Sequence, residues 1–244
     1  MLTRIFLGYN INNIKYLEVK GMYDEYFDLE RQEKMRSSFL EIGKRGEMRK
    51  YPKNSLIKMN GRDVICIVMS GNLKQSIYSM EGEEKILYLL QGGEIFKEMD
   101  YFSGGESKLV TKALEDSTIS ILDERIVQEI LLEDPHIYRD IIHSITRKFR
   151  IVMFQMANMA FSDSVGKVAD TLIRLYYQEG EEIDQGKKIN ERFTHEEIAK
   201  LIGCSRVTVT RALKKFKDEK IIDIVSGEIV IRDIENLEKY IKWK

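Results

Sequence analysis

The sequence predicts an α+β chain, in which a long helix joins an N-terminal antiparallel β jelly-roll to a C-terminal helix-turn-helix with a following hairpin. Three observations predict it. Residues 46–122 contain about eight short apolar runs separated by turn residues, as in an antiparallel barrel or sandwich. Residues 136–161 keep an unbroken helical period, and residues 194–217 have the spacing of two short helices around a glycine.

The length and composition predict two compact domains. A chain of 244 residues exceeds one typical domain, and 43% of it is hydrophobic. We expect a barrel domain with an N-terminal extension over residues 1–135, a connecting helix over 136–161 and a helix-turn-helix domain over 162–244. The absence of a run of about eighteen apolar residues predicts a cytoplasmic protein without membrane contact. Two cysteines, Cys66 and Cys204, are too few for a disulfide framework.

The barrel region divides into eight predicted strands at turn sequences such as Ser70-Gly71-Asn72 and Gly92-Gly93. The predicted strands are residues 47–51, 56–59, 64–68, 73–80, 85–90, 94–96, 109–114 and 118–122. A helix over residues 23–42 is expected before them and another over 123–132 after them. The second helix must stop before Pro135, because proline disfavours helical geometry in the residue that precedes it.

The long helix, predicted from His136 to Phe161, carries an apolar stripe that we call the heptad seam. Its residues alternate in spacing between four and three, as in a coiled coil: Tyr138, Ile142, Ile145, Phe149, Val152, Met156 and Met159. The seam could simply pack on the barrel. Because Ile141, Met153 and Ala157 offer additional apolar surface, we expect one face to meet the barrel and the other to meet a second copy of the chain.

The C-terminal region has strong helix-start signals. Thr194 and Glu197 have the spacing of a capping box, Gly203 suits a left-handed turn, and Ser205 can cap a second helix. Val209, Leu213 and Phe216 recur on the face that should be buried. A helix over residues 163–178, a polar linker over 179–192, a hairpin of strands 221–225 and 228–231, and a last helix over 234–243 complete the expected winged helix.

The outward face of the second helix predicts binding to double-stranded DNA. Guanidinium and hydroxyl groups can read base edges in the major groove, and ammonium groups behind them can bind phosphates. Residues 192–220 carry eight lysines and arginines against four acidic residues, whereas residues 81–135 carry five against fourteen. An ordinary basic surface helix is the alternative. The predicted DNA contacts are Thr194, Ser205, Arg206, Val207, Thr208, Thr210, Arg211, Lys214 and Lys215.

An enzyme is not expected. Metal-dependent catalysis in a jelly-roll needs two or three histidines that converge inside the barrel, and residues 46–122 contain none. His136 and His143 are two helical turns apart, too far to share one ion. We therefore predict no catalytic residue and no metal ligand.

The order of barrel, long helix and winged helix, together with the segment THEEIAKLIGCSRVTVTRALKKFKDEKII, resembles the CRP/FNR family of bacterial transcription regulators over about residues 40–235. The resemblance implies a cyclic-nucleotide-binding-like sensor that controls the protein allosterically, a homodimer on an inverted repeat, and RNA polymerase as a partner if the protein activates. It also implies base readout by Arg206 and Arg211. Many members carry glutamate where this chain has Val207, so we expect a half-site that favours A·T.

The sensor departs from the cofactor-binding and cyclic-AMP branches of that family. Where cyclic-nucleotide members have a Gly-Glu run and an Arg-Ser pair, this chain has Lys97-Glu98-Met99 and Lys108-Leu109. We therefore do not expect cyclic AMP. The iron–sulfur branch needs an N-terminal cysteine cluster, but the first cysteine is Cys66. The haem branch needs a barrel ligand, and the histidines lie outside the barrel region, so no cofactor is expected.

The segments EEKILYLL and VTVTR are similar to the halorespiration-regulator branch. That resemblance implies an aromatic acid bound between barrel and long helix by Tyr88 and a basic side chain, Arg147 or Lys148. A core position for Tyr88, control by a protein partner and the absence of any effector stay open, as does a redox role for Cys204. The predicted effector-binding residues are Tyr88, Lys97, Glu98, Met99, Lys108, Arg147 and Lys148.

Overall fold

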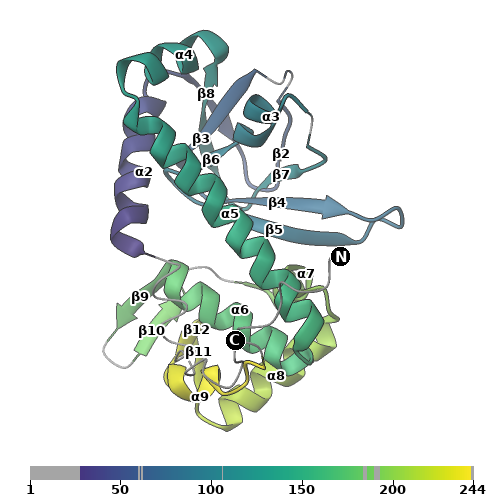
Figure 1. The fold of residues 1–244 in the computed structure, drawn as a ribbon. Coiled ribbons are helices and arrows are strands. Elements are labelled where there is room, and N and C mark those ends of the chain that lie inside the picture. The colour runs from purple at the N-terminus through teal and green to yellow at the C-terminus, as the bar shows by residue number, and fades with distance from the viewer. Residues whose placement is uncertain are drawn as a thin grey trace, which may run out of the picture.

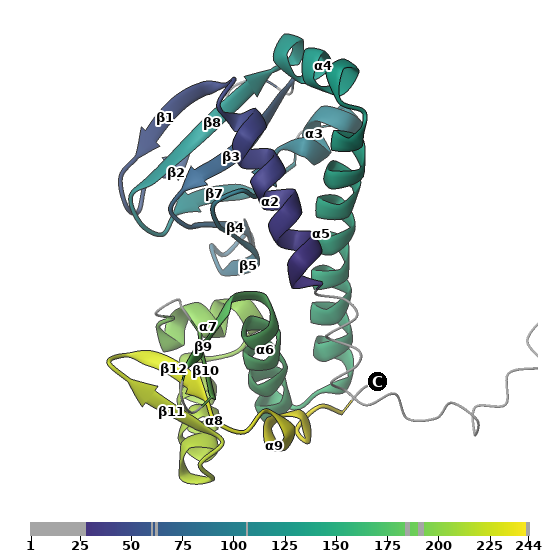
Figure 2. The ribbon, with the colours of Figure 1, turned by 90° about the vertical axis from the view of Figure 1, so that its left-hand side faces the viewer.

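The computed structural model describes residues 28–59, 61, 63–105, 107–183, 186–189 and 193–242. A β domain lies at one end and a smaller helical domain at the other, with one long helix running beside both (Figure 1). Figure 2 shows this helix along one side of the whole molecule. The predicted α+β fold class is confirmed. None of the described helices has the length and apolar character needed to span a membrane.

The β domain consists of eight strands in two four-stranded antiparallel sheets. The first sheet has the order β1-β8-β3-β6 and the second the order β2-β7-β4-β5. All eight predicted strands are present, with ends that differ from the prediction by at most two residues. Their bounds are Glu47–Tyr51 (β1), Leu56–Ile57 (β2), Val64–Ser70 (β3), Leu73–Tyr78 (β4), Glu84–Leu90 (β5), Ile95–Phe96 (β6), Val110–Ala113 (β7) and Ser117–Asp123 (β8).

Three helices accompany these sheets. Helix α2 spans Leu29–Gly43, and the earlier part of its predicted range lies outside the described residues. Helix α4 spans Glu124–Glu133, close to its predicted bounds. Helix α3, Glu98–Ser103, was not expected, and Lys97 precedes it in left-handed geometry with φ 68°. The segment has too few residues for a helical period to stand out in the sequence.

Helix α5 spans His136–Phe161, as predicted, and its two faces differ in burial. Ile137 and Ile141 pack with α2 and α4, whereas Ile151 and Phe154 join the core cluster that includes the barrel side chains. Met153, expected to extend the apolar surface of the helix, does not join the buried face and is 51% exposed. The side chain next to it, Phe154, takes the buried position.

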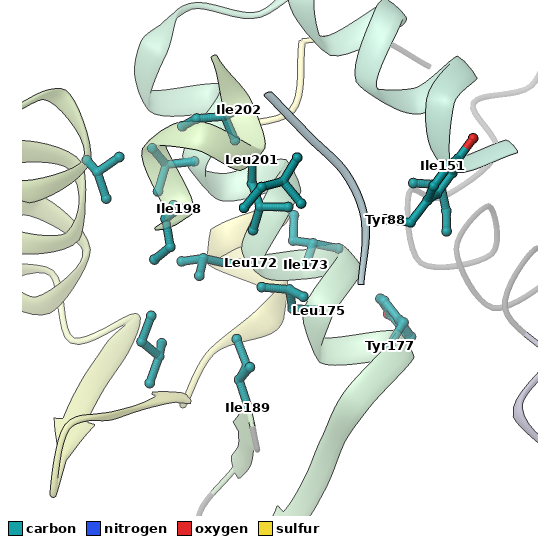
Figure 3. Close-up of a cluster of buried hydrophobic side chains, with 14 of the residues drawn as sticks. Tyr88, Ile151, Leu172, Ile173, Leu175, Tyr177, Ile189, Ile198, Leu201 and Ile202 are labelled. Atoms are coloured by element: carbon teal, nitrogen blue, oxygen red, sulfur yellow. The ribbon is translucent and has the colours of Figure 1, made fainter. Parts of the chain in front are cut away.

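The C-terminal domain packs four helices and a sheet around one core. The helices are α6 (Ser164–Glu179), α7 (His195–Ile202), α8 (Arg206–Asp218) and α9 (Ile234–Glu238). Leu172 and Ile173 of α6 lie among Ile198, Leu201 and Ile202 of α7 (Figure 3). Helix α9 is shorter than the predicted helix, and residues 243–244 lie outside the described part.

The polar segment 179–192 is not simply a linker, which corrects the sequence prediction. It contains strands β9 (Gly180–Ile183) and β10 (Gly186–Ile189). Together with the predicted hairpin, β11 (Ile222–Val225) and β12 (Glu228–Ile231), they form a sheet in the order β11-β12-β10-β9. Lys187 of β10 is 7% exposed, and its ammonium lies 4.8 Å from the ring centroid of Tyr176.

Candidate nucleic-acid interface and effector pocket

Local caps fix the helix-turn-helix. The Thr194 hydroxyl accepts a hydrogen bond from the Glu197 backbone N–H at 3.1 Å, and Thr194 N–H donates to the Glu197 carboxylate at 2.8 Å. Gly203 adopts the left-handed geometry with φ 67°. The Ser205 hydroxyl then accepts from the Thr208 N–H at 3.2 Å. The predicted capping box, turn and second cap are therefore confirmed, and they set the direction in which α8 leaves α7.

Helix α8 divides into a buried face and a basic exposed face. Val209, Ala212, Leu213 and Phe216 are buried in the domain core. Five exposed side chains form one face. Thr210, Arg211 and Lys214 lie four, five and eight positions after Arg206, and Val207 lies three and four positions before Thr210 and Arg211. No carboxylate of the described residues lies within ion-pair distance of Arg206, Arg211 or Lys214. Such a face can bind an external polyanion.

The hydroxyl groups predicted for DNA contact already have internal partners. The Thr208 hydroxyl lies 2.9 Å from that of Ser205. The Thr210 hydroxyl donates to the Arg206 carbonyl at 3.0 Å and lies 2.8 Å from His195 Nδ1. Thr194 and Ser205 serve as caps. The hydroxyl groups therefore stabilise the helices, and the guanidinium groups are the side chains left for base contact.

The predicted phosphate contacts differ in their surroundings. Lys215 lies with its ammonium 4.6 Å from the ring centroid of Tyr240, whose hydroxyl helps to raise the pKa of the lysine. Lys214 projects from the exposed face beside Arg211. Lys215 is therefore the less available of the two cations.

A pocket of about 350 Å³ lies in the barrel. Lys97 and Met99 of the predicted effector set line it, together with Gln75, Asp100 and Thr111. Gln75 Nε2 donates to the Thr111 hydroxyl at 3.2 Å, but Gln75 Oε1 is buried without a hydrogen-bond partner. The Lys97 ammonium lies 3.4 Å from the Asp100 carboxylate. The pocket is therefore lined by an amide whose buried oxygen lacks a hydrogen-bond partner and by a cation that is already compensated.

Three other residues of the predicted effector set form a buried group. The Lys148 ammonium donates to Glu98 at 2.6 Å and to the Ile95 carbonyl at 2.7 Å. It also lies 6.0 Å from the ring centroid of Tyr88, whose pKa is raised by burial and then by Glu98. Tyr88 is 7% exposed and belongs to a core cluster, in which Figure 3 labels it with Ile151.

The remaining two residues of the set lie apart from these groups. Arg147 donates to Glu94 at 2.8 Å and lines a cleft against α2. Lys108 is exposed and is not among the residues that line the barrel pocket. The seven residues predicted to bind an effector thus do not converge on one site. Gln75 and Thr111 were missed, because only the fold brings them beside Lys97. Asp100 lies three positions after Lys97 and was missed because one such pair is no signal of a site.

The β domain contacts the C-terminal domain through the first residues of β5. Burial alone would raise the pKa of Glu84, but hydrogen bonds from Lys74, Ser76 and Lys200 outweigh it and lower the pKa to about 2. Lys200 of α7 lies 3.1 Å from Glu84, and the Lys85 ammonium donates to the Leu201 carbonyl. Burial lowers the pKa of Lys85 to about 8. These contacts tie α7 to the barrel.

Both domains match known families. Residues 48–134 match the cyclic nucleotide-binding domain family, and residues 166–240 match the Crp-like helix-turn-helix domain family. A cAMP-activated global transcriptional regulator CRP from Haemophilus influenzae is 28% identical over 187 residues, which cover 75% of this chain and 83% of that protein.

Solved structures share the fold. A CooA mutant from Carboxydothermus hydrogenoformans superposes with a TM-score of 0.71 at 24% identity, covering 82% of this chain and 89% of that chain. OCPA-complexed CprK superposes with a TM-score of 0.67 at 20% identity, covering 83% and 92%. The similarity thus extends through both domains and the long helix.

Proposed function

Because the chain belongs to the CRP/FNR family, whose members are transcription regulators and not enzymes, we propose that it acts as a homodimer that reads an inverted repeat under the control of a small effector. The chain is a DNA-binding regulator with an effector-binding domain. The proposal adds the dimer, the residues that read the bases and the chemistry of the effector.

The heptad seam supports the dimer. In the single chain Tyr138, Ile142, Phe149, Met156 and Met159 are exposed, with Phe149 at 63% and Met156 at 65%. Such a continuous apolar stripe on a charged protein is the kind of surface that a partner buries. A second α5 fits it, because the spacing of the stripe is that of a two-helix seam.

The test of the dimer is the double variant Phe149→Glu, Met156→Glu. Two carboxylates in the seam would have to be desolvated on association, so we expect a monomer by sedimentation velocity and weak binding to an inverted repeat. Met80→Glu is the control, because Met80 is 99% exposed and lies in the β4–β5 turn, away from the seam. A double variant that stays dimeric contradicts the proposed interface.

The exposed face of α8 supports the proposed base readers. Arg206 and Arg211 reach guanine edges as bidentate donors, and Lys214 binds phosphate. Thr208 and Thr210 support the helix through their internal hydrogen bonds, and Lys215 is a secondary phosphate contact. In the dimer, the two copies of α8 occupy successive major grooves about 34 Å apart.

Val207 sharpens the expected site preference. Its side chain is 57% exposed on the same face, where an apolar group suits a thymine methyl. Selection of binding sites from random DNA by the wild type and by Val207→Glu should give different preferred bases, because glutamate accepts from cytosine N4. Identical preferences in the two selections contradict a base contact by residue 207. Binding should also weaken steeply with salt, as counterion release requires.

The barrel pocket supports a small effector with an apolar body and a hydrogen-bond donor. The donor would satisfy Gln75 Oε1, whose burial without a partner is otherwise unfavourable. Cyclic AMP, the activator in the name of the Haemophilus relative, fits less well. Lys97 is compensated by Asp100, and the described lining residues include no arginine for a cyclic phosphate. An anion between Tyr88 and Lys148 is less favoured, because Glu98 already pairs with that lysine.

A thermal-shift screen of cyclic nucleotides and aromatic compounds tests the effector. We expect an aromatic donor to raise the melting temperature of the wild type and to lose its effect in Gln75→Leu. Lys108→Gln, an exposed change, is the control. A response to cyclic AMP contradicts the proposed chemistry. If no compound acts, the alternative is an effector-independent regulator or one controlled by a protein partner. If the protein activates transcription, we expect contact with RNA polymerase.

A further inference from the structure

A cleft of about 260 Å³ lies between the start of α2 and the middle of α5, apart from the barrel pocket and from α8. In the view of Figure 2, α2 runs between the barrel strands and α5. The described residues that line the cleft are mostly cationic or polar. They are Asp28, Arg31, Ile142, His143, Thr146, Arg147 and Arg150.

Among the described residues that line this cleft, cationic side chains outnumber carboxylates. They contribute three guanidinium groups, an imidazole and one carboxylate, Asp28, whose Oδ1 accepts from the Arg31 backbone N–H at 3.0 Å as the cap of α2. Arg147 is compensated by the buried Glu94 at 2.8 Å. The Arg31 side chain is exposed, and no carboxylate within the described ranges forms an ion pair with it.

The cleft is held in shape by buried partners of Arg147. That side chain is 8% exposed. With its amide oxygen turned toward the guanidinium groups, Gln32 of α2 accepts from Arg147 Nε at 3.1 Å and from Nη2 at 2.9 Å. These bonds join α2 to α5 and fix one cationic wall before any ligand arrives. A preformed wall lowers the entropic cost of binding.

From this arrangement we propose that the cleft binds the phosphate group of a small molecule. Guanidinium groups approach from two helices, and a tetrahedral phosphate presents oxygens in several directions, whereas one fork satisfies a planar carboxylate. The Thr146 hydroxyl adds a neutral donor. The volume lies below the roughly 300–1,000 Å³ of most organic-ligand sites, so the ligand is inorganic phosphate or a short phosphorylated metabolite.

The pKa of His143 responds to the positive charge of the same cleft. Burial lowers the pKa of His143, and Arg31, Arg147 and Arg150 lower it further, while Asp140 opposes them. Asp28, which precedes α2 as its cap, is the carboxylate among the described residues that line the cleft. A phosphate dianion in the cleft would favour the imidazolium, so the pKa of His143 should rise when the ligand binds.

Calorimetry and thermal shift on the full chain test the site, with inorganic phosphate, glycerol phosphate, succinate and sodium chloride at equal ionic strength. We expect inorganic phosphate or glycerol phosphate to stabilise the fold and the other two not to, and the stronger of the two phosphates identifies the source. In Arg31→Gln, Arg150→Gln, the Kd should rise at least about tenfold. Arg139→Gln is the matched control, because Arg139 is an exposed arginine on the same helix.

NMR titration of His143 in the wild type is a second measurement that needs no variant. We expect its pKa to rise in saturating phosphate and to stay unchanged in chloride. An equal stabilisation by chloride, an unchanged affinity in the double variant or an unmoved His143 titration would each overturn the proposal.

Discussion

The charged side chains of the sensor and those of the recognition helix α8 are arranged in opposite ways. In the sensor, Lys148 and Glu98 are 3% and 0% exposed and lie 2.6 Å apart. On α8, Arg206 and Arg211 are exposed, without an ion-pair partner in the described part of the chain. Charged side chains thus form buried ion pairs that stabilise the β domain, whereas those of α8 face the solvent. The charges of α8 are therefore available to a ligand, whereas those of this buried pair are not.

The pKa values agree with this contrast. Burial alone would raise the pKa of Glu94, but Arg147, Arg36 and Lys148 outweigh it and lower the pKa below its usual value. The carboxylate therefore remains ionised inside the protein, because its cationic neighbours and a hydrogen bond from the Gln91 backbone N–H favour the charged form. The sensor depends on these pairs for its fold, whereas α8 can lose a charge without leaving another charge buried.

The largest expected effect is a loss of stability when the buried cation of the β domain is removed. Lys148→Met leaves Glu98 buried without its cation, so we expect the free energy of unfolding to fall by about 3–5 kcal/mol in chemical denaturation. The double variant Lys148→Met, Glu98→Leu should recover most of that loss. Lys214→Met on α8 should change stability by less than about 0.5 kcal/mol. Similar losses for both lysines would remove the contrast.

The next largest effect is expected in DNA binding, when an exposed cation of α8 is removed. Arg206→Ala should leave the unfolding free energy nearly unchanged and should weaken binding to the selected DNA site by about 1–3 kcal/mol, with relaxed preference at one base position. Lys214→Ala should instead weaken all sequences alike and reduce the slope of binding against salt by about 1. Titration of selected and scrambled DNA at several salt concentrations separates the two. Uniform weakening by Arg206→Ala refutes base readout.

The smallest effect sharpens the contrast within α8. Because the Ser205 hydroxyl caps the helix, Ser205→Ala should lower the unfolding free energy by about 1 kcal/mol. Ser205→Asn, which can cap equally well, should restore it. DNA binding by the folded Ser205→Ala variant should keep the wild-type base preference. An altered preference with unaltered stability would assign the hydroxyl to the DNA.

Local signals made the helix-turn-helix predictable from the sequence. Thr194, Glu197 and Ser205 act on backbone groups within three positions, so the sequence alone specifies both helix starts. The eight strands were equally visible, because turn residues separate them. The β9–β10 hairpin was missed because Lys187, a charged residue, takes a buried position by packing on Tyr176.

The effector region was less predictable, because its interactions join distant parts of the chain. Lys148 pairs with a carboxylate 50 positions earlier, and Arg147 with one 53 positions earlier. Adjacent residues on α5 thus contact different parts of the β domain. The sequence shows that both residues are basic, but it does not show which carboxylate each one pairs with. Gln75 and Lys97 come together only when β4 and the start of α3 face the same pocket.

The bond from Lys85 to the Leu201 carbonyl has a further consequence. The last carbonyls of a helix have no partner within it, and here one of those of α7 is satisfied by a lysine 116 positions away, in another domain. Leu201 lies two residues before Gly203, at the corner that aims α8. A lysine of the β domain thus satisfies a carbonyl at the C-terminal end of α7, the first helix of the helix-turn-helix. Separating β5 from α7 would leave the Leu201 carbonyl without this partner beside the turn that orients α8, so the bond links the barrel to the position of the recognition helix.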